Sequence, residues 1–218
     1  SSMDHKRALD HDEGLNTGGM GTVAPNPYYT PAVAERCMQE IFLPTVAAMQ
    51  AEGCPFKGCL YFGLMLTPDG PKVIEYNCRF GDPETQVVLP LLESDLLTVM
   101  EATTNGTLDK TDVKFSDGAA ACVILASGGY PLAYEKGKEI TGLTAGQLDA
   151  ADVTVYHAGT AIKDGSLVTN GGRVLGVTAT ANTLPEALKK AYAATESIHF
   201  DKLHKRSDIG ARALAAMQ

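Results

Sequence analysis

The segment from residue 57 to residue 77 constrains the fold most, because two strand-like runs are joined there by a very short turn. Residues 57–67 (KGCLYFGLMLT) are largely apolar, and residues 72–77 return as a second run after the residues TPDGP. Proline, aspartate and glycine favour tight turns, and parallel strands would need a much longer crossover. The sequence therefore predicts an antiparallel hairpin whose first strand is largely buried.

Polar side chains gather at the end of the second strand, within VIEYNCRFGDPETQ (residues 73–86). Because side chains alternate faces along a strand, Val73, Glu75 and Asn77 are expected on one face, with Ile74 and Tyr76 on the other. Glu75 and Asn77 would lie about 6.6 Å apart along the strand, and both offer the hard oxygen ligands that Mg²⁺ prefers. A solvated glutamate at a half-exposed strand edge would show the same spacing.

The residues that follow favour the metal interpretation. Arg79 supplies a fork of donors suited to phosphate oxygens. Gly81 and Pro83 shape a turn, while Asp82 and Glu84 place carboxylates beside an expected helix start. A pair of metal ligands, a phosphate-binding arginine and a sharp turn in so short a span indicate a nucleoside-triphosphate site.

A glycine-rich stretch near the start, DHKRALDHDEGLNTGGMGTVAP (residues 4–25), is a second candidate. Its glycines allow close backbone approach to a ligand. It lacks the G-K-[ST] of a Walker loop. A dinucleotide-binding fingerprint would follow a strand, and no strand is expected before this stretch. Taken alone, such a loop is more often a turn than a ligand site. The candidate binding residues are Asp4, Lys6, Arg7, Asn16, Thr17, Gly18, Gly19 and Gly21. His5 stands between the first two in the sequence.

A third stretch, TNGGRVLGVTA (residues 169–179), contains Gly171, Gly172 and Arg173. A hairpin turn entering a strand is the favoured interpretation. The alternative is a backbone nest in which Arg173 faces a ligand phosphate.

The remaining pattern predicts an α+β fold. Residues 1–14 read as a polar loop, and a helix begins at Thr30-Pro31, is kinked by Pro44 and ends at Gly53. Residues 105–117 are polar and nonperiodic, which marks a boundary, and Asp164-Gly165 is a hairpin signal. Further helices are expected at 84–91, 94–104 and from Thr183 to about 197, and strands at 119–126, 138–142, 152–157, 160–163, 166–169 and 173–180.

Composition excludes some classes of function. The net charge of -8 argues against a nucleic-acid surface, because binding to phosphate backbones needs a basic stripe. No apolar run approaches the ~20 residues of a membrane span. The five cysteines form no C-x-x-C pair, so reduced cytosolic thiols are expected. His204, Lys205 and Arg206 are expected to form a solvated basic patch.

Five stretches together resemble the C-terminal half of the phosphoribosylamine–glycine ligase family of ATP-grasp enzymes. They span nearly the whole chain in order, and the first two are more specific to this family than to ATP-grasp proteins in general. One departure is Leu15, where the family usually has proline, and it implies a slightly different loop entry. The stretches are DHKRALDHDEGLNTGGMG, GPKVIEYNCRFGDPETQ, SGGYPLAYEKGKEITGL, HAGTAIKDGSLVTNGGRVLGVTA and KRSDIGARAL.

The resemblance implies a reaction of purine biosynthesis. ATP would phosphorylate the carboxylate of glycine, and 5-phosphoribosylamine would attack the acyl phosphate to give glycinamide ribonucleotide, ADP and phosphate. The family's metal ligands, for Mg²⁺ or Mn²⁺, fall on Glu75 and Asn77. Arg79 would hold the transferring phosphoryl group, and Asp82 would help to position the substrate amine. The stretch at residues 14–21 would contact the ribose phosphate or glycine.

The resemblance also implies a division of the chain. Residues 1–104 would be the C-terminal part of the ATP-grasp domain, an antiparallel sheet with helices. Residues 105–218 would be the family's C-terminal domain, smaller and mostly antiparallel with a helix. The N-terminal domain and the other ATP-grasp subdomain are not identifiable, so the chain alone is expected to be inactive. Its partners would be glycine, 5-phosphoribosylamine and ATP, together with the N-terminal half or a second copy.

Two other classes of function remain open. Another ATP-grasp ligase, such as a carboxylase of the same pathway, would lack the paired DHKR and NTGGMG stretches. A noncatalytic fragment that binds a phosphorylated metabolite or a partner would show no turnover of its own.

Overall fold

The chain folds into two compact units of α+β structure, as the sequence predicts. The structure is a computed structural model, and it describes residues 1–143 and 152–218. The first unit comprises Ser1–Asn26, Asp82–Leu91 and Ser116–Gln218, and the second comprises Pro27–Gly81 and Leu92–Phe115. The expected boundary at residue 104 concerns the family's domains and stays a prediction.

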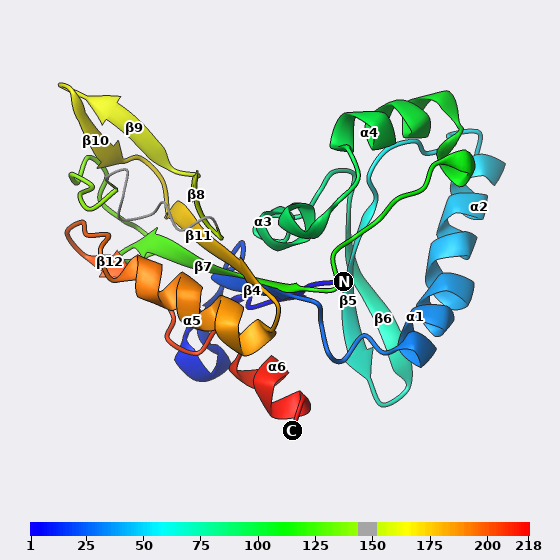
Figure 1. The fold of residues 1–218 in the computed structure, drawn as a ribbon, viewed down its shortest axis with the longest axis horizontal. Helices are drawn as coiled ribbons and strands as arrows, with labels where there is room; N and C mark the ends of the chain where they lie inside the picture. Colours follow the sequence, from blue (N-terminus) through cyan, green and yellow to red (C-terminus); the bar gives the residue numbers. More distant parts are fainter. Residues whose placement is uncertain (144–151) are drawn as a thin grey trace. The chain divides into compact units, whose positions relative to one another are not determined.

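An antiparallel sheet forms the centre of the first unit (Figure 1). Within the segment expected as an opening loop (residues 1–14), Met3–Asp4 is in fact a strand of this sheet, because it pairs with Gly21–Ala24, which pairs with Ala119–Ser127 about a hundred residues further along the chain. Local patterning in a two-residue strand carries no such signal. In order, the strands are β1 (Met3–Asp4), β4 (Gly21–Ala24), β7 (Ala119–Ser127), β11 (Arg173–Ala181) and β8 (Val153–His157), and β12 (Leu203–His204) also pairs with β7.

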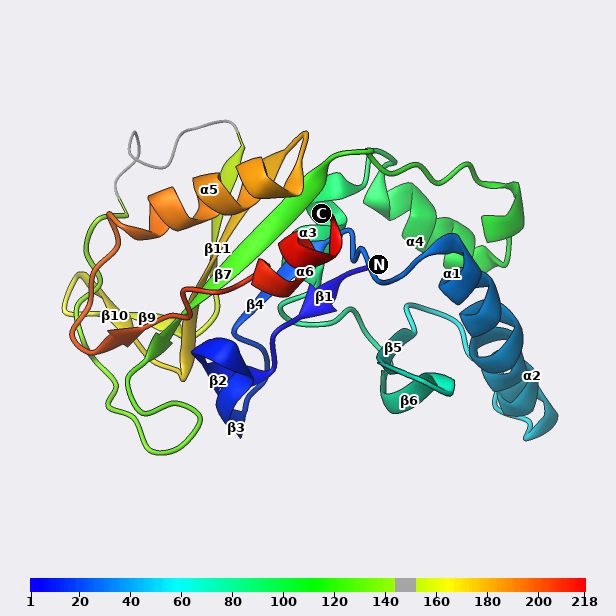
Figure 2. The ribbon, with the colours of Figure 1, turned by 90° about the horizontal axis from the view of Figure 1, so that it is seen from below.

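Helices cover both faces of this sheet. On one face, α5 (Leu184–Thr195) and α6 (Ala211–Ala216) lie against the strands (Figure 2). The helix predicted from Thr183 is confirmed, and the Thr183 hydroxyl donates to Glu186 Oε2. On the other face, α3 (Thr85–Val88) and the 3₁₀ turn η3 (Leu89–Leu91) pack against Cys122 and Ile124.

Two small hairpins complete the first unit. Strands β2 (Arg7–Leu9) and β3 (Glu13–Asn16) flank the 3₁₀ turn η1 (Asp10–Asp12). Strands β9 (Thr160–Lys163) and β10 (Ser166–Thr169) are joined by Asp164-Gly165, as predicted. The strand expected at 138–142 is absent, and only isolated bridges form at Glu139 and Thr141. The left-handed Gly137 and Gly142 interrupt the extended backbone at each side.

The second unit packs an interrupted helix against the predicted hairpin. Thr30 caps α1 (Pro31–Cys37), a π-helical stretch η2 (Met38–Phe42) follows, and α2 (Leu43–Ala51) continues from it. The interruption precedes Pro44, whose nitrogen donates no helical hydrogen bond. Strands β5 (Tyr61–Thr67) and β6 (Gly70–Asn77) pair antiparallel, and α4 (Leu96–Asn105) and the 3₁₀ turn η4 (Leu108–Lys110) complete the unit.

The first strand of this hairpin is less buried than expected. It begins only at Tyr61, and the side chains of Met65 and Leu66 are exposed. The sheet of this unit has two strands. A helix covers one face of it, and side chains on the other face stay exposed. The prediction of a largely buried strand was therefore wrong.

Candidate functional site

The predicted metal pair lies on the β5–β6 hairpin of the second unit. Gly63 is opposite Glu75 and Leu64 is opposite Val73, so Ile74 is an extra residue that forms a bulge. A bulge of this kind interrupts the alternation of faces. Val73 consequently lies with Tyr76 along an apolar cavity of about 570 Å³ beside α2. The expectation that Val73 shares a face with Glu75 was therefore wrong.

Glu75 and Asn77 follow the bulge, so the alternation between these two residues is kept. Glu75 is exposed and Asn77 is partly exposed. A Cβ atom on Gly63 would lie only 2.7 Å from Glu75 Cγ, so the glycine leaves the space that the glutamate occupies. A carboxylate and an amide oxygen that both reach solvent from one strand face suit Mg²⁺ or Mn²⁺.

The other predicted residue of the hairpin, Arg79, follows β6 and is exposed. Its Nη1 atom donates to the carbonyl of Phe80 at 2.8 Å. This bond holds one edge of the guanidinium against its own loop. A planar guanidinium in such a position can offer paired donors to a phosphate.

A second group of predicted residues meets in the first unit, around Arg173. Its Nη1 atom donates to the carbonyl oxygens of Gly18 and Asp82, each at 2.9 Å. The same atom lies 3.2 Å from Asp82 Oδ1. Because these contacts join the glycine loop to the DPE turn, we expect Arg173 to hold the two segments together rather than to lie open for a phosphate.

The predicted glycines are in places where a side chain would not fit. Gly19 has a left-handed φ of 119°, and a Cβ atom there would lie 2.4 Å from Pro83 Cδ. A Cβ atom on Gly21 would lie 2.7 Å from Ile209 Cδ1, and one on Gly171 would lie 2.8 Å from the Cα of Gly159. The sequence correctly indicated close backbone approach, but the partners are other parts of the chain.

Tyr130 contacts two of the predicted site residues, and sequence reasoning missed it. Its hydroxyl accepts from the Gly18 amide at 2.9 Å, and a Cβ atom on Gly172 would lie 2.2 Å from its ring. Ser127 stabilises the neighbouring turn, because its hydroxyl donates to the Gly171 carbonyl at 2.8 Å. Both residues stand in SGGYPLAYEKGKEITGL, so the resemblance carried a signal that spacing alone did not.

The turn at 170–172 joins β10 to β11, which belong to different sheets, so the favoured hairpin interpretation was wrong.

Asp4 is the most buried carboxyl of the glycine-rich stretch. Its side chain is only 7% exposed, and Lys6 Nζ lies 2.8 Å from Oδ2. Burial, together with the nearby Glu84 carboxyl, raises the pKa of Asp4 to about 6, while Lys6 and the His5 amide oppose this. Such a carboxyl holds or releases a proton close to neutral pH.

Other residues of the glycine-rich stretch hold its backbone in place through hydrogen bonds. Thr17 Oγ1 donates to the Lys6 carbonyl at 2.8 Å and accepts from the Gly19 amide at 2.9 Å. Asn16 is opposite Arg7 in the β2–β3 hairpin, and Arg7 Nη1 donates to the Gly14 carbonyl at 2.7 Å. Of these residues, Arg7 and Asn16 are exposed.

His5 joins the loop to the C-terminal segment. Its ring is buried, Nδ1 lies 3.0 Å from the Gly21 carbonyl, and the Gly210 amide donates to Nε2 at 3.1 Å. This pattern requires a neutral ring with the proton on Nδ1. Burial lowers the pKa of His5, which favours the same neutral form.

The expected basic patch at 204–206 is absent. Arg206 is 1% exposed and binds Asp208 through Nε at 2.7 Å and Nη2 at 2.9 Å. Its Nη1 atom donates to Asp12 Oδ1 at 3.1 Å. The cluster was mistaken for a solvated patch because its carboxylate partner Asp12 lies almost two hundred residues away in the sequence.

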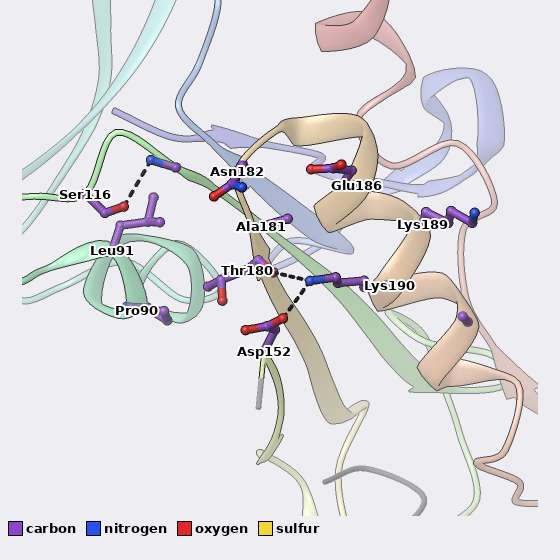
Figure 3. A pocket seen from close by; sticks show the side chains of 12 residues that line it. Pro90, Leu91, Ser116, Asp152, Thr180, Ala181, Asn182, Glu186, Lys189 and Lys190 are labelled. Carbon is purple, nitrogen blue, oxygen red and sulfur yellow. Dashed lines mark hydrogen bonds and ion pairs between the residues drawn. The ribbon is translucent and has the colours of Figure 1, made fainter. Parts of the chain in front are cut away.

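A cavity of about 680 Å³ lies elsewhere in the first unit, beside α5 and β11 (Figure 3). Lys190 points into it and lies 2.6 Å from Asp152 Oδ2. None of the residues predicted from the sequence as a site lines this cavity.

Comparisons with known proteins identify the family. The family model described as phosphoribosylglycinamide synthetase, ATP-grasp (A) domain, matches residues 1–85, and the model of the C domain of the same family matches residues 120–212. The chain belongs to the phosphoribosylglycinamide synthetase family. Within it, residues 4–21 and 70–85 lie in the part matched by the A domain, while Tyr130 and Arg173 lie in the part matched by the C domain.

Named relatives agree with this assignment. The phosphoribosylamine–glycine ligase of Vibrio vulnificus is 50% identical over 219 residues, which cover 100% of this chain and 51% of the relative. A bifunctional purine biosynthetic protein of Schizosaccharomyces pombe is 49% identical over 98% of this chain and 27% of its own length. The chain therefore spans about half the length of the bacterial relatives it matches.

Solved structures show the same fold. The phosphoribosylamine–glycine ligase of Thermotoga maritima matches 95% of this chain and 50% of its own, with 41% identity and a TM-score of 0.83. The biotin carboxylase subunit of a pyruvate carboxylase matches with 17% identity and a TM-score of 0.58, which shows a shared fold alone.

Proposed function

We propose that this chain is part of an ATP-dependent carbon–nitrogen ligase that joins glycine to 5-phosphoribosylamine. The products would be glycinamide ribonucleotide, ADP and phosphate. One observation carries the proposal: the whole chain is 50% identical to a phosphoribosylamine–glycine ligase. The face shared by Glu75 and Asn77 supports it, because it presents the oxygen ligands that Mg²⁺–ATP chemistry needs.

Glu75 and Asn77 would hold the metal ion, Mg²⁺ or Mn²⁺. When bound with ATP, such an ion neutralises phosphate charge. Arg79 would hold oxygens of the phosphoryl group that moves from ATP to the glycine carboxylate. Asp82 would orient the amine that then attacks the acyl carbon as phosphate leaves. Positioning and charge neutralisation by these residues would supply most of the catalysis.

The glycine loop and its neighbours would bind the other substrates. Arg173 and Gly172 would act through the loop shape, since they contact Asp82, Gly18 and Tyr130. Exposed groups of the stretch are left to meet ligands directly. The residues proposed for substrate binding, either directly or through the loop shape, are Asp4, Lys6, Arg7, Asn16, Thr17, Gly18, Gly19, Gly21, Gly171, Gly172 and Arg173.

The setting of the proposed reaction follows from its class. No helix within residues 1–143 and 152–218 is long and apolar enough to cross a membrane. De novo purine synthesis uses small dissolved metabolites, and we infer a cytoplasmic location for this chain. ATP, glycine and 5-phosphoribosylamine would be its ligands.

A chimaera tests the proposed function. This chain would replace the corresponding half of the Vibrio vulnificus relative, and glycine- and phosphoribosylamine-dependent ADP release would be measured. We expect the chimaera to turn over and its Arg79→Ala variant to lose most of that turnover. A folded chimaera that releases no ADP would exclude the function, and the unmodified relative serves as the control.

A further inference from the structure

His5 lies on one face of the opening strand, and its two neighbours in the sequence lie on the other. Side chains alternate faces along a strand, and Met3 of β1 packs in the apolar cluster beneath α5 and α6. His5 continues this alternation, because its backbone amide and carbonyl both bond to residues 20–21, at 3.0 and 2.8 Å. Its side chain, which is 3% exposed, therefore shares the face of Met3. Asp4 and Lys6 form their ion pair on the opposite face.

The ring of His5 joins this strand to the C-terminal segment. Nδ1 lies 3.0 Å from the Gly21 carbonyl, and the Gly210 amide donates to Nε2 at 3.1 Å. Since a carbonyl only accepts and an amide only donates, the two bonds need one protonated and one bare ring nitrogen. An apolar side chain of the same size would leave the buried Gly210 amide without this acceptor, and native proteins contain few such groups.

Gly210 is itself fixed in place. Its φ is 81°, and a Cβ atom there would lie 2.6 Å from Leu188 Cδ1 of α5. The Ile209 amide donates to the Tyr192 hydroxyl at 2.9 Å, and that hydroxyl donates to the Arg206 carbonyl at 3.0 Å. The segment before α6 is thus bound to α5 without help from the ring, and it offers the ring a fixed point of attachment.

The groups around the ring keep it neutral at pH 7. Burial lowers the pKa of His5, and the Arg206 guanidinium lowers it further, whereas the Gly21 carbonyl and the carboxylates of Asp12 and Asp208 raise it. The pKa stays below the ordinary value of 6.5. The neutral ring that results is the form that the two hydrogen bonds require.

We propose that His5 is a positioning residue, which fixes the Asp4–Lys6 pair by binding Gly210 from the opposite face of the same strand. The inference rests on the proposed function, in which Asp4 and Lys6 belong to the stretch that binds glycine or 5-phosphoribosylamine. A displaced binding group weakens ground-state and transition-state binding alike, so it raises KM and leaves kcat nearly unchanged. The proposed metal ligands lie on the β5–β6 hairpin of the other unit, so KM for ATP does not depend on the ring.

Nuclear magnetic resonance of the ¹⁵N-labelled chain tests the contact without requiring turnover. At pH 7, long-range ¹H–¹⁵N correlation should show Nδ1 of His5 protonated and Nε2 bare. The Gly210 amide should exchange slowly with solvent in the native chain and in His5→Gln, and faster in His5→Asn. A cationic ring, the other tautomer, or equal exchange in all three proteins would overturn the link between His5 and Gly210.

The same two substitutions separate the hydrogen bonds in the active chimaera. Glutamine at position 5 places an oxygen where Nε2 lies and keeps the Gly210 bond, whereas asparagine reaches only the Nδ1 position and loses it. We expect His5→Asn to raise KM for glycine or 5-phosphoribosylamine roughly tenfold, with kcat and KM for ATP nearly unchanged, and His5→Gln to restore the native KM. His199→Asn, which replaces an exposed histidine, is the matched control.

The kinetic outcomes distinguish positioning from a merely structural role. Unchanged KM in folded His5→Asn, or equal KM values in the two variants, would overturn the positioning role. A fall in kcat at constant KM would overturn it as well, because that result indicates a smaller folded fraction. Each of these results in an active chimaera leaves the proposed function intact. An inactive native chimaera would overturn the proposed function, while the ring spectrum and the Gly210 exchange would still decide the contact.

Discussion

At the scale of single residues, each unit carries a candidate carboxyl group, and the surroundings of the two groups differ. Glu75 is exposed on a strand, whereas Asp4 is buried beneath the glycine loop with a side chain that is 7% exposed. An exposed carboxyl group is open to a metal ion from solvent. A buried one is held close to its protonated form, so its charge depends on what lies beside it.

The pH dependence of stability should reveal Asp4. Its pKa is raised from 3.8 to about 6 in the folded chain, so the folded state keeps a proton that the unfolded state releases. Between pH 4 and pH 6, rising pH therefore costs about 3 kcal/mol of stability through this group. We expect Asp4→Asn to gain up to that much relative to the native chain on going from pH 4 to pH 7, measured by urea unfolding. If the difference in unfolding free energy between the two proteins does not change with pH, nearby groups already stabilise the charged form of Asp4.

Removing Glu75, the proposed metal ligand, should abolish activity of the chimaera without unfolding the hairpin. We expect the Glu75→Ala variant of the chimaera to lose Mg²⁺-dependent ADP release while its thermal unfolding midpoint changes little, because the side chain is exposed. Glu93→Ala, an exchange of the same kind at another position of the second unit, is the control. Near-normal turnover of Glu75→Ala at saturating Mg²⁺ would remove Glu75 from the site.

At the scale of elements, the C-terminal segment holds the opening hairpin in place. Arg206 precedes α6 and reaches Asp12 in η1, where both His11 and Asp12 have left-handed backbone angles. The Ser207 hydroxyl donates to Asp10 of the same turn. These contacts join the first and the last of the five stretches in the folded chain.

Breaking this buried contact should be costly. Arg206→Ala leaves Asp12 and Asp208 without their shared partner, and loss of one member of a buried pair typically costs 3–5 kcal/mol. Chemical denaturation of the variant measures this loss. Arg212, which lies 3.0 Å from Asp12 Oδ2 but is 66% exposed, provides the control, and Arg212→Ala should cost well under 1 kcal/mol. Equal effects of the two substitutions would contradict the burial argument.

At the scale of the whole molecule, the chain carries only part of the family's length. It spans 51% of the Vibrio vulnificus relative. The β5–β6 hairpin exposes Met65 and Ile74 on a two-stranded sheet. Apolar groups left open in this way favour association with another chain.

The isolated chain should bind ATP weakly and make no glycinamide ribonucleotide. If the rest of the proposed ligase supplies half of the nucleotide contacts, their loss removes several kcal/mol, and ~1.4 kcal/mol is tenfold in affinity. Calorimetric titration with a nonhydrolysable ATP analogue and Mg²⁺ should give a Kd no tighter than the millimolar range. Micromolar binding would mean that the chain completes its nucleotide site by pairing with a second copy.

Light scattering across a concentration series tests that association directly. We expect the mass-average molecular weight to rise with concentration, and the Ile74→Asp variant to reduce the rise because it places a charge on the exposed strand. Ile162→Asp, at a residue 71% exposed on β9, is the matched control. A chain that stays monomeric up to high concentration would exclude self-association.

The sequence by itself determined the local features of this protein. Thr30 begins a helix, Asp164-Gly165 turns a hairpin, and TPDGP places β5 beside β6, because caps and tight turns depend on neighbouring residues. The family resemblance, carried by five stretches in order, was also readable from residues alone. Glu75 and Asn77 keep the alternation predicted for them, since no bulge lies between the two.

Only the tertiary structure decided what lies far apart in sequence. Strands β1 and β4 exist because β7 supplies their hydrogen bonds, and Arg206 is buried because Asp12 returns to meet it. The bulge at Ile74, which moved Val73 away from Glu75, depends on the register with β5. Arg173 meets Gly18 and Asp82 only in the folded chain. Such pairings offset their loop-closure entropy through contacts with distant segments, and a local pattern carries no record of those contacts.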